Sequence, residues 1–365
     1  MNVCMICSGL GHVIRGVERF FLNLASELVR REGVKVTLYG GGNLRNNLLG
    51  YVKVPTIKRS LFRKIIDIQL PIPVSLADNI ELSIFAVTLT PKLLGKNCDI
   101  LLNGTIQNIL PIRVYQKLRE KGGKHIFVNH GGFGIAHLNF NFCDHLVAIN
   151  PLHKTLFEGR LKGKIPVSLI PVGVDTDKFR RVNVTKEEMN LPDKFIIFSS
   201  SALVKQKRID ALIEAASMIE DAYLVIASTG PEMDYLKRLG EKLMGGNIRF
   251  LGGISDQDLI RYYSVADVFC LPSIIEPSPT VLLEAMSCET PVVTNNSYPQ
   301  RWAVNGGGSC VDVRNPKVLS EALERYRDRK LAREVGKLGR KNVEHRFSLK
   351  VVAERYYNLF KEVMG

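Results

Sequence analysis

The chain has 365 residues, of which 45% are hydrophobic, and its formal net charge at pH 7 is +14. This length allows two domains of ordinary size, and no apolar run approaches the roughly 20 residues of a membrane-spanning helix. We therefore expect no membrane-spanning helix and no low-complexity tract. The charge lies mainly in the first half, where residues 1–175 carry 22 Lys and Arg against 11 Asp and Glu.

The N-terminus, MNVCMICSG, has no charged region before its apolar residues, so it reads as a first strand and not as a signal peptide. A cytoplasmic location is expected. The seven cysteines are odd in number and scattered, and we expect all of them to be reduced. Cys4 and Cys7 form a C-x-x-C inside an apolar strand, not at the strand-to-helix turn of a redox pair. No cysteine and histidine set has zinc spacing.

The first elements form a β-α-β unit of Rossmann type. A strand at Asn2–Cys7 leads through a glycine-bearing loop to a helix at Val17–Arg31 and a strand at Val34–Leu38. The loop glycines Gly9, Gly11 and Gly16 do not match G-x-G-x-x-G, so the dinucleotide fingerprint is absent. These glycines can still let a phosphate approach the backbone. The alternative is a tight turn and nothing more.

Residues 58–75 mix four cations with apolar residues. A short basic amphipathic segment can lie on an anionic membrane surface, or it can be a surface helix with one face in the core. Strands are then expected at 99–103, 124–129 and 144–150, with a helix at 109–121. His130, in HGGFG, follows the second of these strands, where open α/β sheets place ligands. The alternative is that His130 caps a turn.

Residues 168–179 are rich in Pro and Gly and read as the interdomain linker. Asp175 and Asp177 have the D-x-D spacing that some glycosyltransferases use for a divalent metal, but a linker is a poor place for such a site.

The second half alternates strands and helices and therefore predicts a parallel sheet covered on both faces. Lys205, Lys207 and Arg208 occupy a strand-to-helix loop, where cations could meet a diphosphate, although a solvated basic loop is also consistent with the pattern. The expected strands are 195–199, 222–227 and 247–251, and the expected helices are 209–219, 233–244, 256–265, 315–329, 330–343 and 348–363.

Residues 267–294 read as strand, loop, helix and strand. Ser278 and Pro279 predict a helix start, with serine as N-cap and proline at the first position. The amides of Thr280 and Val281 then suit a phosphate. Glu276 precedes this start and Glu284 follows it. Glu284 would be costly if buried without a partner, and ribose hydroxyls are suitable donors. The alternative places Glu284 on a solvent-facing stripe.

Together these segments resemble the retaining GT-B glycosyltransferases of family four, also called glycosyl transferases group 1. The resemblance covers nearly the whole chain. Its most specific element is the E-x7-E pattern from Glu276 to Glu284, and the weaker elements are RGVERFFLNLASEL, HGG, IPVGVD and ALVKQKRID. It implies an α/β GT-B fold of two Rossmann-like, doubly wound parallel-sheet domains facing a cleft. The implied domains are 1–173 on the acceptor side, 174–345 on the nucleotide-sugar side, and a helix at 346–365 crossing back onto the first.

The resemblance also implies roles for single residues. Glu284 would bind ribose, Glu276 would face the transferred sugar, and His130 would lie near that sugar. The diphosphate would contact Lys207, with Arg208 beside it. It would also contact the helix start at Pro279, Thr280 and Val281. The Gly16 loop would approach it from the other domain. Backbone near Gly253 and Ile254 would contact the base. The implied catalytic residues are Glu276, Lys207 and His130.

Three positions depart from the family pattern. Ala202 stands where an arginine is common, so Lys205 or Arg208 would have to substitute. Pro277-Ser278-Pro279 replaces the usual residues after the first glutamate, and Glu289 replaces a common glycine. These changes bear most on the identity of the donor. The sequence itself does not name the sugar, the nucleobase, the acceptor or the linkage.

The expected activity is metal-independent transfer of a sugar, with retained configuration, from a nucleotide-diphosphate donor to a glycan or lipid-linked acceptor. No cofactor and no metal are expected, and an anionic membrane surface is a candidate partner through the basic first half. One alternative is a GT-B relative acting as a nucleotide-sugar epimerase or hydrolase. Another is a nucleic-acid-binding protein, but the single tryptophan, Trp302, and the scattered tyrosines do not form stacking platforms, so no nucleic-acid partner is expected.

Overall fold

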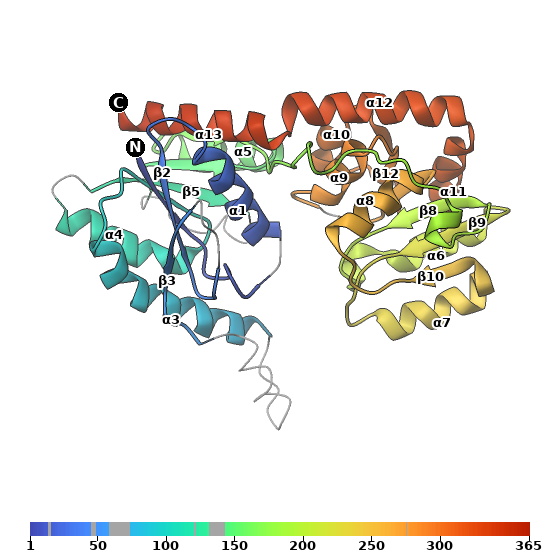
Figure 1. Cartoon of the computed structure of the whole chain (residues 1–365), viewed down its shortest axis with the longest axis horizontal. Helices are drawn as coiled ribbons and strands as arrows, with labels where there is room; N and C mark the ends of the chain where they lie inside the picture. Colours follow the sequence, from blue (N-terminus) through green and yellow to red (C-terminus); the bar gives the residue numbers. More distant parts are fainter. Residues whose placement is uncertain (14–15, 45–48, 58–73, 120–121, 131–142, 275) are drawn as a thin grey trace, which may run out of the picture. The chain divides into compact units, whose positions relative to one another are not determined.

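The computed structural model describes residues 1–365 except 14–15, 45–48, 58–73, 120–121, 131–142 and 275. The chain forms two compact units (Figure 1). The first contains Met1–Pro171 and Val352–Gly365, and the second contains Val172–Val351. The domain boundary expected after residue 173 lies two residues beyond this division. The C-terminal part of the first unit begins at Val352, whereas the sequence predicted a returning segment that begins at 346.

The first unit is built on a seven-stranded sheet in the order β3-β2-β1-β4-β5-β6-β7. Every pair of neighbouring strands is parallel. The strands are β1 Asn2–Ile6, β2 Lys35–Gly40, β3 Gly50–Lys53, β4 Ile100–Asn103, β5 Lys124–Asn129, β6 His145–Ala148 and β7 Val167–Leu169. The helices are α1 Gly16–Leu28, α3 Val74–Leu94, α4 Ile109–Leu118, α5 Pro151–Leu161 and α13 Leu349–Met364.

The second unit is built on a six-stranded sheet in the order β10-β9-β8-β11-β12-β13, again with every pair parallel. The strands are β8 Phe195–Ser199, β9 Ala222–Ile226, β10 Ile248–Phe250, β11 Val268–Leu271, β12 Val292–Asn295 and β13 Gly308–Val311. The helices are α6 Ile209–Ser217, α7 Met233–Met244, α8 Asp256–Val265, α9 Thr280–Ser287, α10 Tyr298–Val304, α11 Pro316–Glu324 and α12 Arg329–Arg346.

Strand β8 shows why the sequence folds in this way. Ile196 and Phe198 belong to the core on one face of the sheet, and Phe195 and Ile197 belong to the core on the other. Successive side chains of a strand point to opposite faces, so a continuous apolar run requires cover on both. Helices α8, α9 and α12 contribute residues to the first core, and α6, α7 and α11 contribute to the second.

Helix α3 was not expected from the sequence. It spans Val74–Leu94, contains Pro91 and packs against α4 (Figure 1). Its β-branched residues and weak segregation of polar from apolar positions hide the helical period that reveals α1. The predicted basic segment 58–75 lies outside the described residues except for its last two positions. No helix within the described ranges is both long and apolar enough to cross a membrane.

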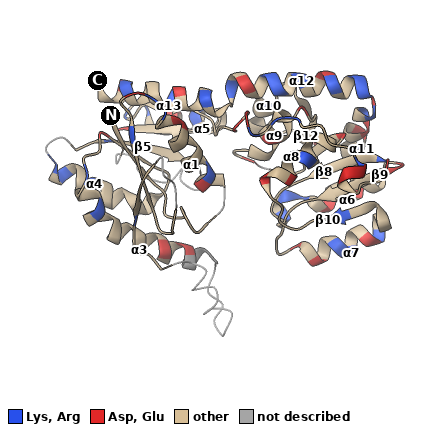
Figure 2. Ribbon diagram, in the orientation of Figure 1, with Lys and Arg blue, Asp and Glu red and all other residues tan. Residues whose placement is uncertain are grey.

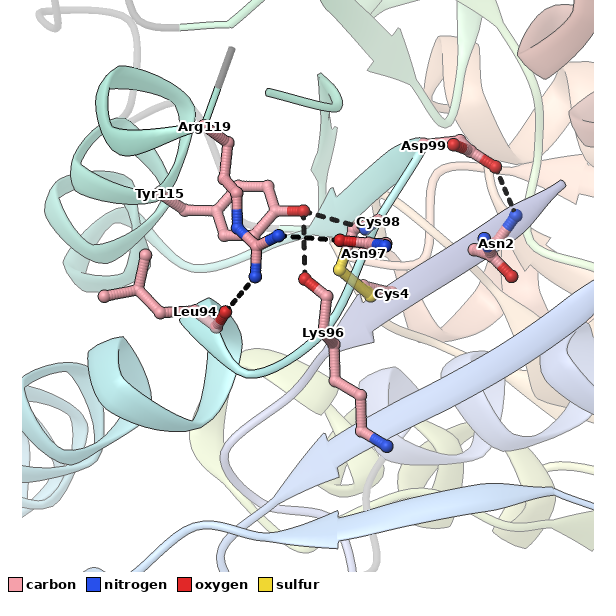
Figure 3. Close-up of a disulfide and its surroundings, with 9 residues drawn as sticks. All are labelled: Asn2, Cys4, Leu94, Lys96, Asn97, Cys98, Asp99, Tyr115 and Arg119. Atoms are coloured by element: carbon pink, nitrogen blue, oxygen red, sulfur yellow. Dashed lines mark hydrogen bonds between the residues drawn. A yellow bond between two sulfur atoms is a disulfide. The ribbon is translucent and has the colours of Figure 1, made fainter. Parts of the chain in front are cut away.

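The expectation that all seven cysteines are reduced is wrong for two of them. Cys4 in β1 and Cys98, just before β4, form a disulfide with their Cα atoms 5.7 Å apart (Figure 3). Strands β1 and β4 are neighbours in the sheet, so residues 94 positions apart in sequence meet. The segment around Cys98 is held by the Tyr115 hydroxyl, which accepts the Cys98 N–H at 2.8 Å. Only the tertiary structure brings these thiols together.

Candidate functional site

The loop after β11 and the start of α9 bring together the carboxylates singled out by the sequence. Helix α9 begins at Thr280, with Pro279 at the cap position and no side-chain cap, so the expected Ser278 cap is wrong by one residue. The Thr280 N–H donates to the Ser278 carbonyl at 2.9 Å. The proline, with its fixed φ, favours a helix that begins immediately after it.

Lys207 and Glu276 form an ion pair although they are 69 positions apart. The Lys207 ammonium donates to Glu276 Oε2, and both side chains are mostly buried. Lys207 ends a short 3-10 turn at Lys205–Lys207 after β8, and Glu276 follows β11, the strand beside β8. Adjacent parallel strands place both loops at the same edge of the sheet. The pair gives this edge one cation and one carboxylate within direct contact.

Glu284 is 5% exposed and therefore does not lie on a solvent-facing stripe. Its Oε2 accepts a hydrogen bond from the Tyr263 hydroxyl at 3.1 Å, and Tyr263 is fully buried. A carboxylate has about four acceptor positions, so one such bond leaves capacity for other donors. Tyr263 was not identified from the sequence, because a tyrosine in α8 cannot be paired with a residue in α9 without the fold.

The remaining cations of the loop differ in their partners. Arg208 has a left-handed backbone with φ 51°, and its Nε lies 3.2 Å from both carboxylate oxygens of Asp210. Lys205 is exposed and lines the same cavity of about 540 Å³ as Arg208 and Tyr235. Ala202 is exposed.

Gly253 and Ile254 follow β10 in an open loop. A Cβ added at Gly253 would meet nothing within 4 Å, whereas Ile254 packs against the core. A planar ligand can approach such a backbone closely.

In the first unit, Gly16 begins α1 and His130 follows β5. The His130 ring packs against Phe20 with 4.6 Å between ring centroids. Burial lowers the pKa of His130 from 6.5 to about 4, so the ring is neutral near pH 7. Its Nε2 is buried and has no hydrogen-bond partner among the described residues. The glycines that follow His130 lie outside the described residues.

Residues 182–342 match the model of the family Glycosyl transferases group 1. This part of the chain is therefore similar to that family. The match confirms the resemblance drawn from Glu276, Glu284 and their neighbours.

A curated glycosyltransferase is similar to about half of this chain. The lipopolysaccharide core biosynthesis glycosyltransferase LpsE of Rhizobium meliloti is 29% identical over 185 residues, which is 49% of this chain and 54% of LpsE. The chain spans about half the length of the curated relatives it matches.

Solved structures resemble the whole chain. Sucrose-phosphate synthase from Thermosynechococcus elongatus superposes with a TM-score of 0.80 at 19% identity, covering 99% of this chain and 98% of that one. Anabaena Alr3699/HepE in complex with UDP and glucose gives a TM-score of 0.76 at 13% identity, covering 99% and 100%. At this identity the likeness shows the fold alone, and the predicted GT-B fold with two parallel Rossmann-like sheets is confirmed.

Two buried glutamates near the loop after β1, Glu18 and Glu81, were not predicted from the sequence as site residues. Glu18, in α1, is 8% exposed and lies under Gly9, where an added Cβ would come within 2.0 Å of Glu18 Oε1. His12 Nε2 lies 3.0 Å from Oε1 of the fully buried Glu81. Glu18 could have been identified from the sequence because it lies within the motif RGVERFF. Glu81 could not, because it lies in α3, a helix that the sequence did not predict.

The D-x-D of the linker has protein partners. Asp175 Oδ1 accepts the N–H groups of Asp177 and Lys178 at 3.1 and 3.0 Å, and Asp177 pairs with Lys350 at 2.7 Å. These contacts hold the turn that follows β7. Within the described ranges no group of three or more His, Cys, Asp or Glu side chains could hold a metal ion.

Proposed function

We propose that this chain is a hexosyltransferase that moves a sugar from a nucleotide-diphosphate donor to a hydroxyl acceptor, with retained configuration and without a divalent metal. The ion pair of Lys207 with Glu276 beside the start of α9 carries the proposal. The match of residues 182–342 to the group 1 family supports it, as does the complex of the similar HepE with UDP and glucose.

The diphosphate leaves with growing negative charge. Lys207 and the positive end of α9, with the amide of Val281, stabilise that charge in place of a metal. Glu276 then faces the transferred sugar, where positive charge develops. Glu284 lies four residues beyond Thr280, or about 6 Å along the helix at roughly 1.5 Å per residue, and binds the ribose hydroxyls.

The reaction exchanges one C–O bond for another at the anomeric carbon. The bond from this carbon to the diphosphate oxygen breaks, and the acceptor hydroxyl attacks from the face that the nucleotide leaves. The departing phosphate oxygen takes the hydroxyl proton, so a dedicated side-chain base is unnecessary. The neutral ring of His130 can donate or accept one hydrogen bond to a substrate without adding charge.

The variants Lys207→Ala and Glu276→Ala test the proposal, and Lys237→Ala, at an exposed position of α7, is a control that removes one cation elsewhere. Loss of charge stabilisation predicts a fall in kcat of about 10² to 10³ for both site variants and an unchanged control. The assay separates acceptor-linked sugar from free or epimerised sugar, and thereby a transferase from a hydrolase or epimerase. Full turnover by either folded site variant overturns the assignment.

The acceptor is a glycan or a lipid-linked saccharide, and the enzyme works on the cytoplasmic face of an anionic membrane. The basic excess of residues 1–175 supports this part of the proposal, since clustered cations bind anionic surfaces. The similar LpsE is named as a lipopolysaccharide core biosynthesis glycosyltransferase. Co-sedimentation with vesicles that contain or lack anionic lipid tests it, and equal binding to both argues against it.

A further inference from the structure

A second charged cavity lies in the second unit, away from the candidate donor site. It has a volume of about 470 Å³, and its lining includes Asp267 and Pro291, which directly precede β11 and β12. Glu276 instead follows the carboxyl end of β11. All strand pairs of this sheet are parallel, so the two places lie at opposite edges, separated by a strand of about 13 Å at roughly 3.3 Å per residue. We call this the amino-edge cavity.

One wall of the amino-edge cavity is a row of cations on α12. Arg329, Arg333 and Lys337 all line it, and their spacing of four residues places them on one face of the helix. Basic positions recur along α12 in Figure 2. Like charges at this spacing repel, and Arg329 is the first residue of the helix, where the positive end of the macrodipole disfavours a cation. The Asp328 carboxylate caps this end and offsets part of that cost.

The other charges of the cavity do not neutralise this row. Lys186 Nζ lies 3.6 Å from Asp267 Oδ2, so these two side chains form an ion pair and their charges offset each other. The same carboxylate oxygen also accepts the Ile196 N–H. Glu289 then remains against Arg181 and the three cations of the row. None of these four cations forms an ion pair within the described part of the chain. Residues 176–365 as a whole are nearly balanced in charge, with 28 Lys and Arg against 25 Asp and Glu.

We propose that the amino-edge cavity binds a phosphate-bearing ligand, and this site is separate from the donor site of the proposed function. Three exposed arginines and one exposed lysine line it, and the planar fork of arginine matches phosphate oxygens in a bidentate manner. The volume lies within the roughly 300 to 1,000 Å³ of small-molecule sites. A phosphomonoester or diphosphate removes the repulsion along α12 and fills a polar, partly enclosed space. The phosphate belongs either to a soluble molecule or to a lipid headgroup.

Titration of the full chain with inorganic phosphate at constant ionic strength tests the site. Lys207→Ala is present in every variant, so that phosphate at the donor site contributes little. The Arg329→Ala/Arg333→Ala pair removes two lining cations, and Lys330→Ala/Lys341→Ala removes two exposed cations of the same helix outside the lining. The expected loss of affinity is about tenfold or more for the first pair and less than about twofold for the second. Equal affinity in all variants, or equal loss in both pairs, overturns the proposal.

Two further measurements complete the experiment. Thermal unfolding without phosphate at low salt shows whether the first pair folds, and its Tm is expected to stay level or rise because repulsion along α12 falls. Flotation with vesicles of phosphatidylcholine with or without phosphatidic acid identifies the source of the phosphate. Binding to phosphatidic acid that needs Arg329 and Arg333 assigns a headgroup, whereas binding of free phosphate alone assigns a soluble ligand. Binding of neither overturns the site.

Discussion

The Tyr263 hydroxyl donates to Glu284 Oε2 at 3.1 Å inside the core of the second unit, and these residues belong to neighbouring helices, α8 and α9. A buried carboxylate without donors is strongly disfavoured, so the hydrogen bond from Tyr263 helps to stabilise and orient Glu284. This contact links the stability of the helix pair to the residue proposed to bind ribose.

Tyr263→Phe removes that donor while keeping the ring and its packing. We expect a loss of about 1 to 3 kcal/mol in the free energy of unfolding, because the carboxylate loses a partner in a buried place. The exposed Tyr298→Phe should change stability by less than about 0.5 kcal/mol. Urea unfolding measures both. Equal stability of the two variants means that the hydroxyl of Tyr263 contributes nothing to Glu284.

His130 predicts a pH dependence of stability. Burial holds its folded pKa at about 4, below the ordinary 6.5, so between these values the unfolded chain binds a proton that the folded chain does not. The contribution of neutral His130 is thus present above pH 6.5 and lost as the pH falls toward 4. At about 1.36 kcal/mol per pH unit the loss approaches roughly 3 kcal/mol.

His130→Gln cannot titrate and should therefore lose less stability than the wild type over this pH window. The exposed His345→Gln serves as the control. Other histidines, such as His145 and His153, also have lowered pKa values, so the informative quantity is the difference between variant and wild type at each pH. If that difference does not change between pH 7 and pH 4, folding does not lower the pKa of His130 and the prediction is wrong.

The disulfide of Cys4 with Cys98 predicts five reactive thiols after unfolding in the absence of reductant. Cys98→Ser opens a loop of about one hundred residues, for which a cost of about 2 to 5 kcal/mol in the free energy of unfolding is expected. Thiol labelling in denaturant and urea unfolding test the two statements. Seven labelled thiols, and equal stability of wild type and variant under oxidising conditions, contradict them. Cys310→Ser, which removes a free thiol, is the matched control.

Two helical glycines should respond to alanine in opposite directions. At Gly336 in α12 an added Cβ would lie 2.1 Å from the Glu289 carbonyl oxygen, so backbone must move and stability should fall by about 1 to 3 kcal/mol. At Gly159 in α5 nothing lies within 4 Å, and alanine should stabilise by roughly 0.5 to 1 kcal/mol. Thermal unfolding compares them. A stabilised Gly336→Ala contradicts the close approach of α12 to the end of α9. A destabilised Gly159→Ala contradicts the open space beside that position of α5.

Much of the fold was predictable from the sequence because its signals are local. The apolar run of β8 and the spacing of Phe20, Phe21 and Leu24 in α1 each identify an element from its own residues. Alternation of such elements then predicts parallel sheets. Helix α3 was not predicted because its local pattern of polar and apolar residues is weak.

By itself the sequence determined the Rossmann-like alternation, the carboxylates that flank the start of α9, and the basic excess of the first half, because these depend on residue type and short spacing. Only the tertiary structure decided that Lys207 meets Glu276, that Tyr263 supports Glu284, and that Cys4 reaches Cys98. Each of these contacts joins residues on different elements, and which elements become neighbours depends on the packing of the whole sheet. A contact between distant residues leaves no trace in the local sequence of either partner.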